Sequence, residues 1–313
     1  MYQFIKNLPL VRGYVHDTVA YHVGTAWENR LGLQIFRTLS QFLQFKIRRR
    51  RLDREIRDIV VSLDRDGIVV IENFLERSEF ESVRKEFDQA FEEIDLKPYK
   101  NVQDAKLSRA QISVSESRAK FINISALFEQ NDRLNRIASA AVRRKFKGIP
   151  KVHLDLYQSA DRDGVDNDVE NILHADLHTA TVKMFFYVNE VDESNGAFVY
   201  AKTSHRCTAA RLLHEYELGV RQARLKKNLP IESSLVCLRG KEIRNIIHPK
   251  HREKMRITET QISVKPNTLV IANNMGFHRR GEFTSDKPRK SVQVNFRYLE
   301  RPFGKDLFSR QSI

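Results

Sequence analysis

The sequence predicts a mainly β protein with a helical buttress, an α+β fold in which strands joined by turns form a sandwich or barrel. Two observations predict this class. Short apolar or alternating runs bounded by turn residues recur through the second half of the chain, whereas the first half is dominated by runs with helical spacing. Helices that precede such a set of strands are expected to pack against the sheet that the strands form.

Length and composition allow one sizeable domain with additions. The chain has 313 residues, of which 41% are hydrophobic, and a net charge of +14 that favours an anionic partner without identifying it. Its two cysteines, Cys207 and Cys237, have neither the number for a disulfide framework nor the spacing for a zinc site, which favours a reducing compartment. No apolar run is long enough to span a bilayer, so we expect a cytoplasmic protein.

Residues 1–55 form a basic N-terminal extension. Large apolar residues recur at helical spacing in its second half: Leu31, Ile35, Phe36, Leu39, Phe42 and Leu43. We therefore expect an amphipathic helix over residues 31–47, followed by the basic run Arg48-Arg49-Arg50-Arg51. Such a helix either packs on the rest of the chain or makes a peripheral contact with an anionic membrane or a partner, through residues 31–54.

The helices that follow are predicted from capping and periodicity. A helix beginning at Ile56 should end at the Asp66-Gly67 turn and lead into a strand over residues 68–71. Ser78-Glu79-Phe80-Glu81 has the pattern of a capping box, which predicts a helix from Ser78 to about Phe91. Further helices are expected over residues 133–147 and 211–226.

The strands of the second half are predicted from alternation and from turn residues. The expected strands cover residues 151–158, 181–188, 197–201, 261–264, 268–272 and 290–298. Residues 181–188 are apolar at nearly every position, which is typical of a strand covered on both faces. Turn chemistry at residues 192–196 and at Lys265-Pro266-Asn267 predicts that the strands on either side of each turn pair as a hairpin.

A candidate metal site stands before the strand at residue 181. His174 and Asp176 lie two residues apart, so on an extended segment their side chains point the same way and can bind one ion from one side. This spacing alone is weak evidence, because His153-Leu154-Asp155 has it too. About a hundred residues later His278 stands in a glycine-flanked loop, and Arg289 follows it. The pattern is typical of a two-His-one-carboxylate iron site with an acidic cosubstrate.

Several motifs together resemble those of the phytanoyl-CoA dioxygenase family of Fe(II)/2-oxoglutarate oxygenases, over roughly residues 56–300. The motifs are His174-Ala175-Asp176, Asn195-Gly196-Ala197-Phe198, Thr203-Ser204-His205-Arg206, His278 with Arg289, and the upstream residues 66–75. Two departures stand out. Ala197 and Ala201-Lys202 stand where many members carry proline or glycine, and residues 1–55 have no counterpart.

The resemblance implies a double-stranded β-helix, the jelly roll of the cupin type, as the core of residues 56–300. Residues 207–256 are then a basic insert and residues 301–313 a C-terminal tail. The resemblance also implies catalytic binding of Fe(II) by His174, Asp176 and His278, with 2-oxoglutarate and O2 as cosubstrates and succinate and CO2 as products. Because related halogenases lack the carboxylate at the position of Asp176, we expect hydroxylation.

Two basic residues are candidates for binding the cosubstrate. Arg289 is expected to bind the distal carboxylate of 2-oxoglutarate, because a guanidinium can form two parallel hydrogen bonds with a carboxylate. Alternation places on one face of its strand the polar residues Arg289, Ser291, Gln293, Asn295 and Arg297. Lys183 lies on a buried-looking strand and either binds the cosubstrate or substrate or extends to solvent. His178 is expected beside the site or facing the substrate.

The sequence does not name the substrate. We expect a small or lipid-linked substrate. An anionic one, such as a phosphorylated, nucleotide-linked or CoA-linked molecule, is suggested by the basic residues of the insert, which are Arg244, Lys250, Arg252, Lys254 and Arg256. The alternative hypothesis is a non-catalytic binding or adaptor protein on the same scaffold that recruits an anionic membrane surface or nucleic acid. Nucleic-acid binding is the weaker version, because the run at residues 48–51 has no aromatic residues interleaved with it.

Overall fold

The computed structural model describes residues 26–47, 52–92, 97–98, 107–146, 148–159, 169–176, 181–227 and 245–296. Several predictions lie outside these residues and are not addressed below: the Arg48–Arg51 run, His178, Cys237, Arg244, Arg297 and the tail from residue 301.

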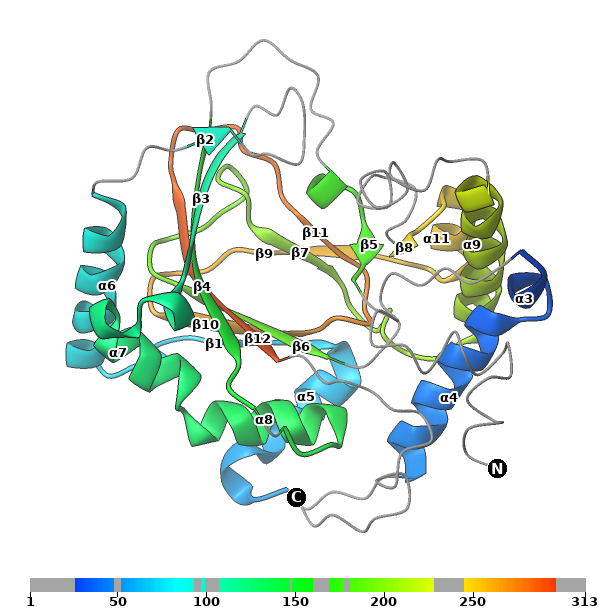
Figure 1. Cartoon of the computed structure of the whole chain (residues 1–313), viewed down its shortest axis with the longest axis horizontal. Helices are drawn as coiled ribbons and strands as arrows, with labels where there is room; N and C mark the ends of the chain where they lie inside the picture. The colour runs from blue at the N-terminus through cyan, green and yellow to red at the C-terminus, as the bar shows by residue number, and fades with distance from the viewer. Residues whose placement is uncertain are drawn as a thin grey trace.

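The described strands form two antiparallel sheets (Figure 1). The seven-stranded sheet has the order β1-β10-β6-β12-β4-β3-β2, with β1 Ile68–Ile71, β2 Lys97–Pro98, β3 Leu107–Ser113, β4 Lys151–Ser159, β6 Val182–Tyr187, β10 Thr268–Asn273 and β12 Arg289–Phe296. The five-stranded sheet has the order β8-β5-β11-β7-β9, with β5 His174–Ala175, β7 Phe198–Ala201, β8 Asn245–Ile246, β9 Glu259–Ile262 and β11 His278–Arg280. Side chains from both sheets share one apolar cluster, so the sheets face each other across a common interior.

The path of the chain confirms the predicted double-stranded β-helix. From β4 onward the chain crosses repeatedly between the sheets: β4, β6, β10 and β12 belong to the large sheet, and β5, β7, β9 and β11 to the small one. The two predicted hairpins are therefore wrong. β6 and β7 lie in different sheets, as do β9 and β10, because the turns at residues 192–196 and 265–267 pass the chain from one sheet to the other. A turn signal shows that the chain reverses, but not which sheet the next strand joins.

Helices cover the outer face of the large sheet, as the predicted buttress requires. These are α5 Arg54–Asp66, α6 Arg77–Phe91 and α8 Asp132–Val142, with the short α7 Ile122–Ile124 beside α6 (Figure 1). Apolar residues of the three long helices share one buried cluster with the even-numbered positions of β4, β6 and β12. The odd-numbered positions of these strands face the interior between the sheets, so period-two alternation separates the core from the candidate site.

Two predicted helix boundaries need correction. The capping box that starts α6 is formed by Glu76 and Glu79, not by the Ser78 motif, so the helix begins at Arg77. The predicted helix over residues 133–147 begins at Asp132 and stops at Val142, because Arg143 adopts a left-handed backbone conformation with φ 55°.

A second group of helices lies at the edge of the barrel. α4 Leu33–Ile47 matches the amphipathic helix expected over residues 31–47, and α3 Ala26–Arg30 precedes it. Both pack against α9 Ala209–Lys227, which corresponds to the helix expected in the insert, and α11 Pro249–Lys254 also contacts α9 (Figure 1). Among the described residues, no helix is both long and apolar enough to cross a membrane.

Phe186 tests the packing between helices and sheet. Its fully buried ring lies 5.1 Å from that of Phe128 and 6.2 Å from those of Phe74 and Phe80, measured between ring centroids. We predict that Phe186→Ala lowers the free energy of unfolding by about 3–5 kcal/mol, because it removes apolar contacts and leaves a cavity. Urea denaturation measures this change, with the half-exposed Val61→Ala on α5 as the control. A loss below about 1 kcal/mol for Phe186→Ala would contradict the packing.

Candidate metal centre

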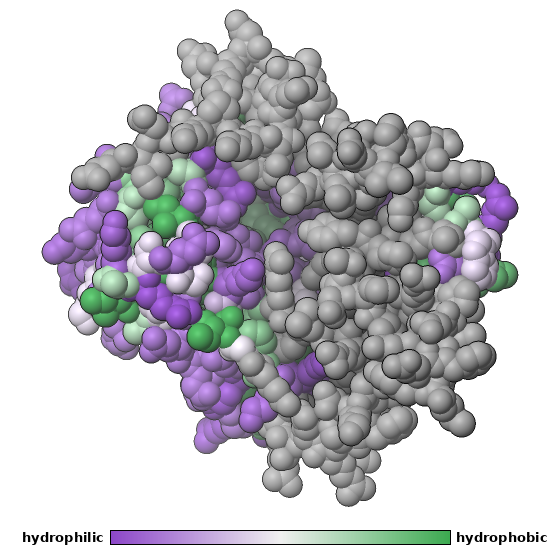
Figure 2. Space-filling view, viewed as in Figure 1, coloured by the Kyte–Doolittle hydropathy of each residue, from purple (hydrophilic) through white to green (hydrophobic). Residues whose placement is uncertain are grey.

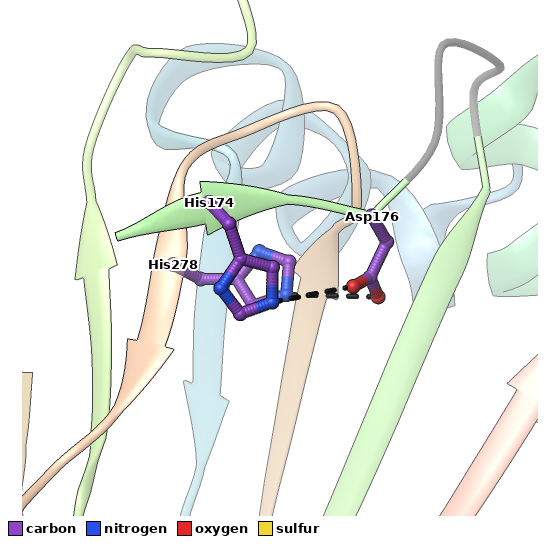
Figure 3. A group of neighbouring side chains, drawn as sticks. All are labelled: His174, Asp176 and His278. Atoms are coloured by element: carbon purple, nitrogen blue, oxygen red, sulfur yellow. Dashed lines mark ion pairs between the residues drawn. The ribbon is translucent and has the colours of Figure 1, made fainter. Parts of the chain in front are cut away.

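Three of the predicted site residues meet at one end of the barrel (Figure 3). His174 lies on β5, Asp176 directly follows β5, and His278 begins β11, which pairs with β5 so that His278 stands opposite His174. Asp176 Oδ1 is 3.5 Å from His174 Nε2, and Asp176 Oδ2 is 3.6 Å from His278 Nε2. Adjacent ligands about 2 Å from one ion lie about 3 Å apart, so the three side chains fit a single transition-metal ion.

Hydrogen bonds orient both imidazole rings towards Asp176. His174 Nδ1 lies 2.6 Å from the carbonyl oxygen of Ile172, and His278 Nδ1 lies 3.0 Å from that of Gly276. A carbonyl only accepts, so each Nδ1 carries the proton and each Nε2 presents a lone pair when its ring is neutral. Burial lowers the pKa of His278 and favours this neutral form. Its Nε2 is buried without a hydrogen-bond partner, which is what a metal ligand requires.

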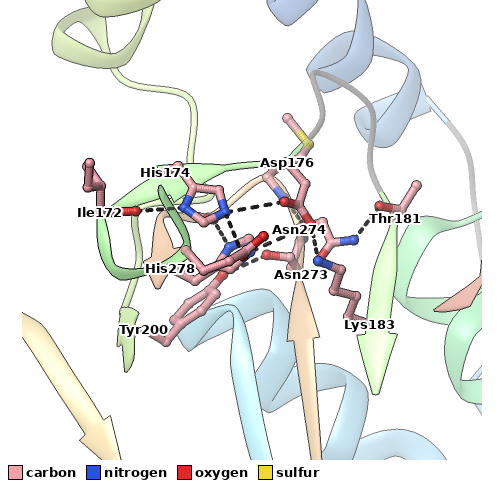
Figure 4. Close-up of polar contacts among 12 residues, drawn as sticks. Ile172, His174, Asp176, Thr181, Lys183, Tyr200, Asn273, Asn274 and His278 are labelled. Carbon is pink, nitrogen blue, oxygen red and sulfur yellow. Dashed lines mark hydrogen bonds and ion pairs between the residues drawn. The ribbon is translucent and has the colours of Figure 1, made fainter. Parts of the chain in front are cut away.

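Asp176 is held as a carboxylate by the positive charge around it (Figure 4). Burial alone would raise its pKa, but the ion pair with the Lys183 ammonium outweighs burial and keeps the pKa of Asp176 well below its ordinary range. The Lys183 ammonium on β6 contacts Asp176 Oδ2 directly. Lys183, whose side chain is 21% exposed, therefore does not extend away into solvent but lies beside the three clustered side chains.

The loop that leads to His278 is anchored by residues whose role the sequence did not indicate. Ser204 Oγ accepts a hydrogen bond from the backbone N–H of Phe277 at 2.8 Å. Arg211 on α9 is buried, stacks on the Phe277 ring at 4.3 Å, and donates to the backbone carbonyls of Ser204 and Met275 at 3.0 and 2.9 Å. Glu215 balances its charge through a 2.7 Å ion pair. The sequence placed Ser204 in a motif and Arg211 in a helix, but the partners of both become adjacent only in the fold.

Gly276 allows this loop to lie close to the barrel wall. A Cβ at this position would lie 1.9 Å from the hydroxyl oxygen of Tyr200, which donates to the backbone carbonyl of Asn273 at 3.0 Å. Any side chain here would displace either Tyr200 or the loop, and with the loop His278.

Arg289 is buried in the barrel interior at the start of β12. Its guanidinium carbon lies 4.3 Å from the centroid of the Tyr157 ring, and its Nη1 donates to the carbonyl of Gly196 at 2.5 Å. Gly196 has φ 79° and packs against Phe283, so a glycine is required at this turn. Within the part of the chain that the structure describes, Arg289 has no carboxylate partner, and its Nε is buried without an acceptor. A buried cation in this state is suited to an anionic ligand.

The second His-x-Asp motif of the chain is a structural feature of β4. Asp155 accepts hydrogen bonds from Arg109 at 2.9 Å and from Gln111 at 2.9 Å, both on the neighbouring strand β3. His153 lies on the same face, opposite Gln293 of β12. Pairing with Arg109 accounts for the buried carboxylate, so the ambiguity between the two motifs is resolved in favour of His174 and Asp176.

The charges of the insert are partly neutralised within the chain. Lys250 pairs with Glu217, and Arg252 pairs with Glu259, which also binds Arg279 at 2.6 Å. These two basic residues therefore do not form the unpaired anion-binding surface that the composition suggested. Close to the metal centre, Glu170, in a 3₁₀ helix over Val169–Asn171, has its Oε2 3.8 Å from His174 Nε2.

No family model matches the chain, and no curated protein matches it. Among solved structures, the epimerase SnoN in complex with Fe3+, alpha ketoglutarate and nogalamycin RO is 11% identical, with a TM-score of 0.49 over 80% of this chain and 88% of that chain. EctD from S. alaskensis in its apoform is 16% identical, with a TM-score of 0.48 over 82% and 85%. HygX from Streptomyces hygroscopicus with nickel and 2-oxoglutarate bound is 16% identical, with a TM-score of 0.45 over 78% and 87%. At these identities and scores the likeness assigns neither activity nor substrate to this chain.

The anchor at Arg211 generates a prediction about metal affinity. The double variant Arg211→Met/Glu215→Gln removes both charges of the buried pair, so neither is left unpaired. We predict that it binds Co²⁺ about ten-fold more weakly than the unaltered chain, because the loop that positions His278 loses two hydrogen bonds and its ion pair. Titration calorimetry measures the affinity, and circular dichroism checks the fold. The exposed Arg206→Met, five positions away, is the control, and equal affinities for all three proteins would contradict a positioning role.

Proposed function

We propose that this chain is a mononuclear non-haem Fe(II) dioxygenase that uses 2-oxoglutarate as cosubstrate and belongs to the phytanoyl-CoA dioxygenase type. The observation that carries the proposal is the buried Nε2 of His278, which has no hydrogen-bond partner and faces Asp176 and His174 inside the barrel. Two imidazoles and one carboxylate on one side of an ion are the donor set of non-haem Fe(II) oxygenases, and they leave other coordination positions for cosubstrate and O2.

His174, Asp176 and His278 would hold the iron. Bound there, the iron supplies the activation of O2 that couples oxidative decarboxylation of 2-oxoglutarate, to succinate and CO2, with oxidation of the substrate. The chain's own part is to fix the ligand atoms. The carbonyls of Ile172 and Gly276 set the proton on each Nδ1, and Lys183 keeps Asp176 ionised.

Arg289 and Lys183 are proposed to bind the cosubstrate. Both project from paired strands of the large sheet into the barrel interior, Lys183 beside Asp176 and Arg289 towards the Gly196 turn. The 2-oxoglutarate dianion carries a carboxylate at each end, and the proposal places one end at the metal beside Lys183 and the distal carboxylate at Arg289. Tyr157, against which Arg289 stacks, would hold the guanidinium plane in place for a bidentate contact.

Aromatic rings line the interior beside the metal centre. Phe198 of β7 lies 5.5 Å from the His278 ring and 5.1 Å from the ring of Phe185 on β6, and Tyr187 follows on the same face of β6. An apolar wall of this kind limits the access of water to an oxidising site.

Hydroxylation is the proposed outcome, because Asp176 supplies the carboxylate that the halogenases of this class lack. The proposed substrate is a small or lipid-linked molecule, and its anionic character rests on the net charge of +14. A non-catalytic adaptor is the less favoured alternative, since a complete donor set beside a buried arginine has no use in a protein that only recruits a partner.

Removal of any one ligand tests the metal assignment. We predict that His174→Ala, Asp176→Ala and His278→Ala each abolish Fe(II)-dependent succinate formation from 2-oxoglutarate, because each leaves only two of three protein ligands. Succinate is measured by chromatography, and circular dichroism checks the fold. The exposed His248→Ala, at the N-cap of α11 and outside the three clustered side chains, is the matched control. Full turnover by any of the three variants would contradict the assignment.

Replacement of Arg289 tests the cosubstrate subsite separately from the metal. Arg289→Lys keeps the positive charge but loses the planar pair of donors, so we predict a rise of roughly ten-fold in the apparent KM for 2-oxoglutarate, equivalent to about 1.4 kcal/mol. Steady-state succinate formation measures the KM. Metal affinity should stay unchanged, since Arg289 is not a ligand. An unaltered KM would assign the distal carboxylate to another residue.

A further inference from the structure

Helix α4 is packed with its polar side inward. Apart from the fully buried Leu33, the buried residues of α4 are polar: Gln34, Arg37 and Thr38 are 1–3% exposed, whereas Phe36, Leu39 and Leu43 are 38%, 45% and 59% exposed. This is the reverse of the usual arrangement on a protein surface, where the apolar stripe of a helix faces the core. With Trp27 and Leu31 from α3 and the turn after it, these three residues make up a set of exposed apolar side chains, called here the outward stripe.

The orientation of α4 is fixed by specific contacts. Gln34 Nε2 donates to Asn29 Oδ1 at 2.9 Å, and Arg37 Nη1 donates to Gln34 Oε1 at 3.1 Å, so the inward side forms a hydrogen-bonded network. Near the C-terminal end of α4, Arg143 donates to the carbonyl of Phe45 at 2.8 Å and lies over the Phe45 ring at 4.0 Å. Turning the helix over would bury the stripe but break this network, which is costly for buried polar groups. The outward stripe is thus a constrained feature of the fold.

The charges around the outward stripe are all of one sign among the described residues of α3 and α4. Arg30 and Lys46 are exposed, whereas Glu28, the acidic residue of this segment, is buried. In the sequence, Lys46 is followed within a few residues by Arg48-Arg49-Arg50-Arg51. A tryptophan, a phenylalanine and leucines bordered by arginine and lysine are the composition that binds the interface of an anionic bilayer. A protein partner that buried the stripe would also need an acidic rim.

We propose that the outward stripe is a docking surface for an anionic membrane. The apolar side chains of the stripe enter the interfacial layer, and the basic residues at its border contact lipid phosphates. α9 packs on the inward side of α4, and its Arg211 also anchors the loop of the metal centre, so docking would set the orientation of the barrel relative to the bilayer. The surface lies outside the metal centre and does not depend on the reaction proposed for it.

Vesicle sedimentation of the full chain tests this proposal. The probes are vesicles of phosphatidylcholine alone and of phosphatidylcholine mixed with phosphatidylglycerol. We expect sedimentation with the anionic vesicles, weakened when salt is raised from about 0.1 M to about 1 M, where the Debye length falls from about 10 Å to about 3 Å. Leu39→Glu and Leu43→Glu should each reduce the partition coefficient about ten-fold or more, because each places a repelled carboxylate in the interface.

A matched control separates the stripe from general surface effects. Ile122 on α7 is 69% exposed, and Figure 2 shows the described surface in the region of α6 and α7 as mainly hydrophilic with small separate apolar patches. Ile122→Glu should bind vesicles as the unaltered chain does. Absence of binding by the unaltered chain would overturn the proposal, as would equal losses for Ile122→Glu. If the unaltered chain does not bind vesicles, a dimer in sedimentation velocity would indicate that a second copy covers the stripe. A monomer would indicate that another segment of this chain covers it.

Discussion

Antiparallel pairing of β11 with β5 is the constraint on which the candidate site depends. These two short strands hold His174 and His278, which are separated by about a hundred residues, directly opposite each other. β11 pairs with β7 on its other side, so its position is fixed by the small sheet and not by the two histidines themselves. Many strand contacts offset the entropic cost of closing this long loop. The geometry of the site therefore follows from the strand pairing.

The interior of the barrel also contains several charged side chains. Three charged groups near the site are paired with an opposite charge: Asp176 with Lys183, Arg211 with Glu215, and Asp155 with Arg109. Arg289 differs from these three pairs, because the contacts of its guanidinium among the described residues are with a ring and a carbonyl. Desolvated charges cost several kcal/mol each unless they are paired, so a cation left with neutral partners marks a place where ligand binding completes the electrostatics.

Sequence reasoning predicted the strands, the fold class and the three clustered side chains, because each depends on local spacing or on motifs. It failed where sheet membership decides the outcome. For both predicted hairpins the turn was located correctly but the strand pairing was wrong. After β6 and after β9 the chain passes to the opposite sheet. Ser204 and Arg211 could not be assigned, because their partner Phe277 is far away in sequence. The helix over residues 33–47 was found from its apolar periodicity, yet periodicity does not show that its apolar side faces outward.

The central claim is that one interior holds both an iron site and an acidic cosubstrate. Anaerobic addition of Fe(II) and 2-oxoglutarate to the unaltered chain tests it most directly, by absorption spectroscopy in the visible range. The account predicts a weak charge-transfer band that requires both components and saturates at one iron per chain. Lack of the band at saturating iron and 2-oxoglutarate, in a correctly folded protein, would contradict the account.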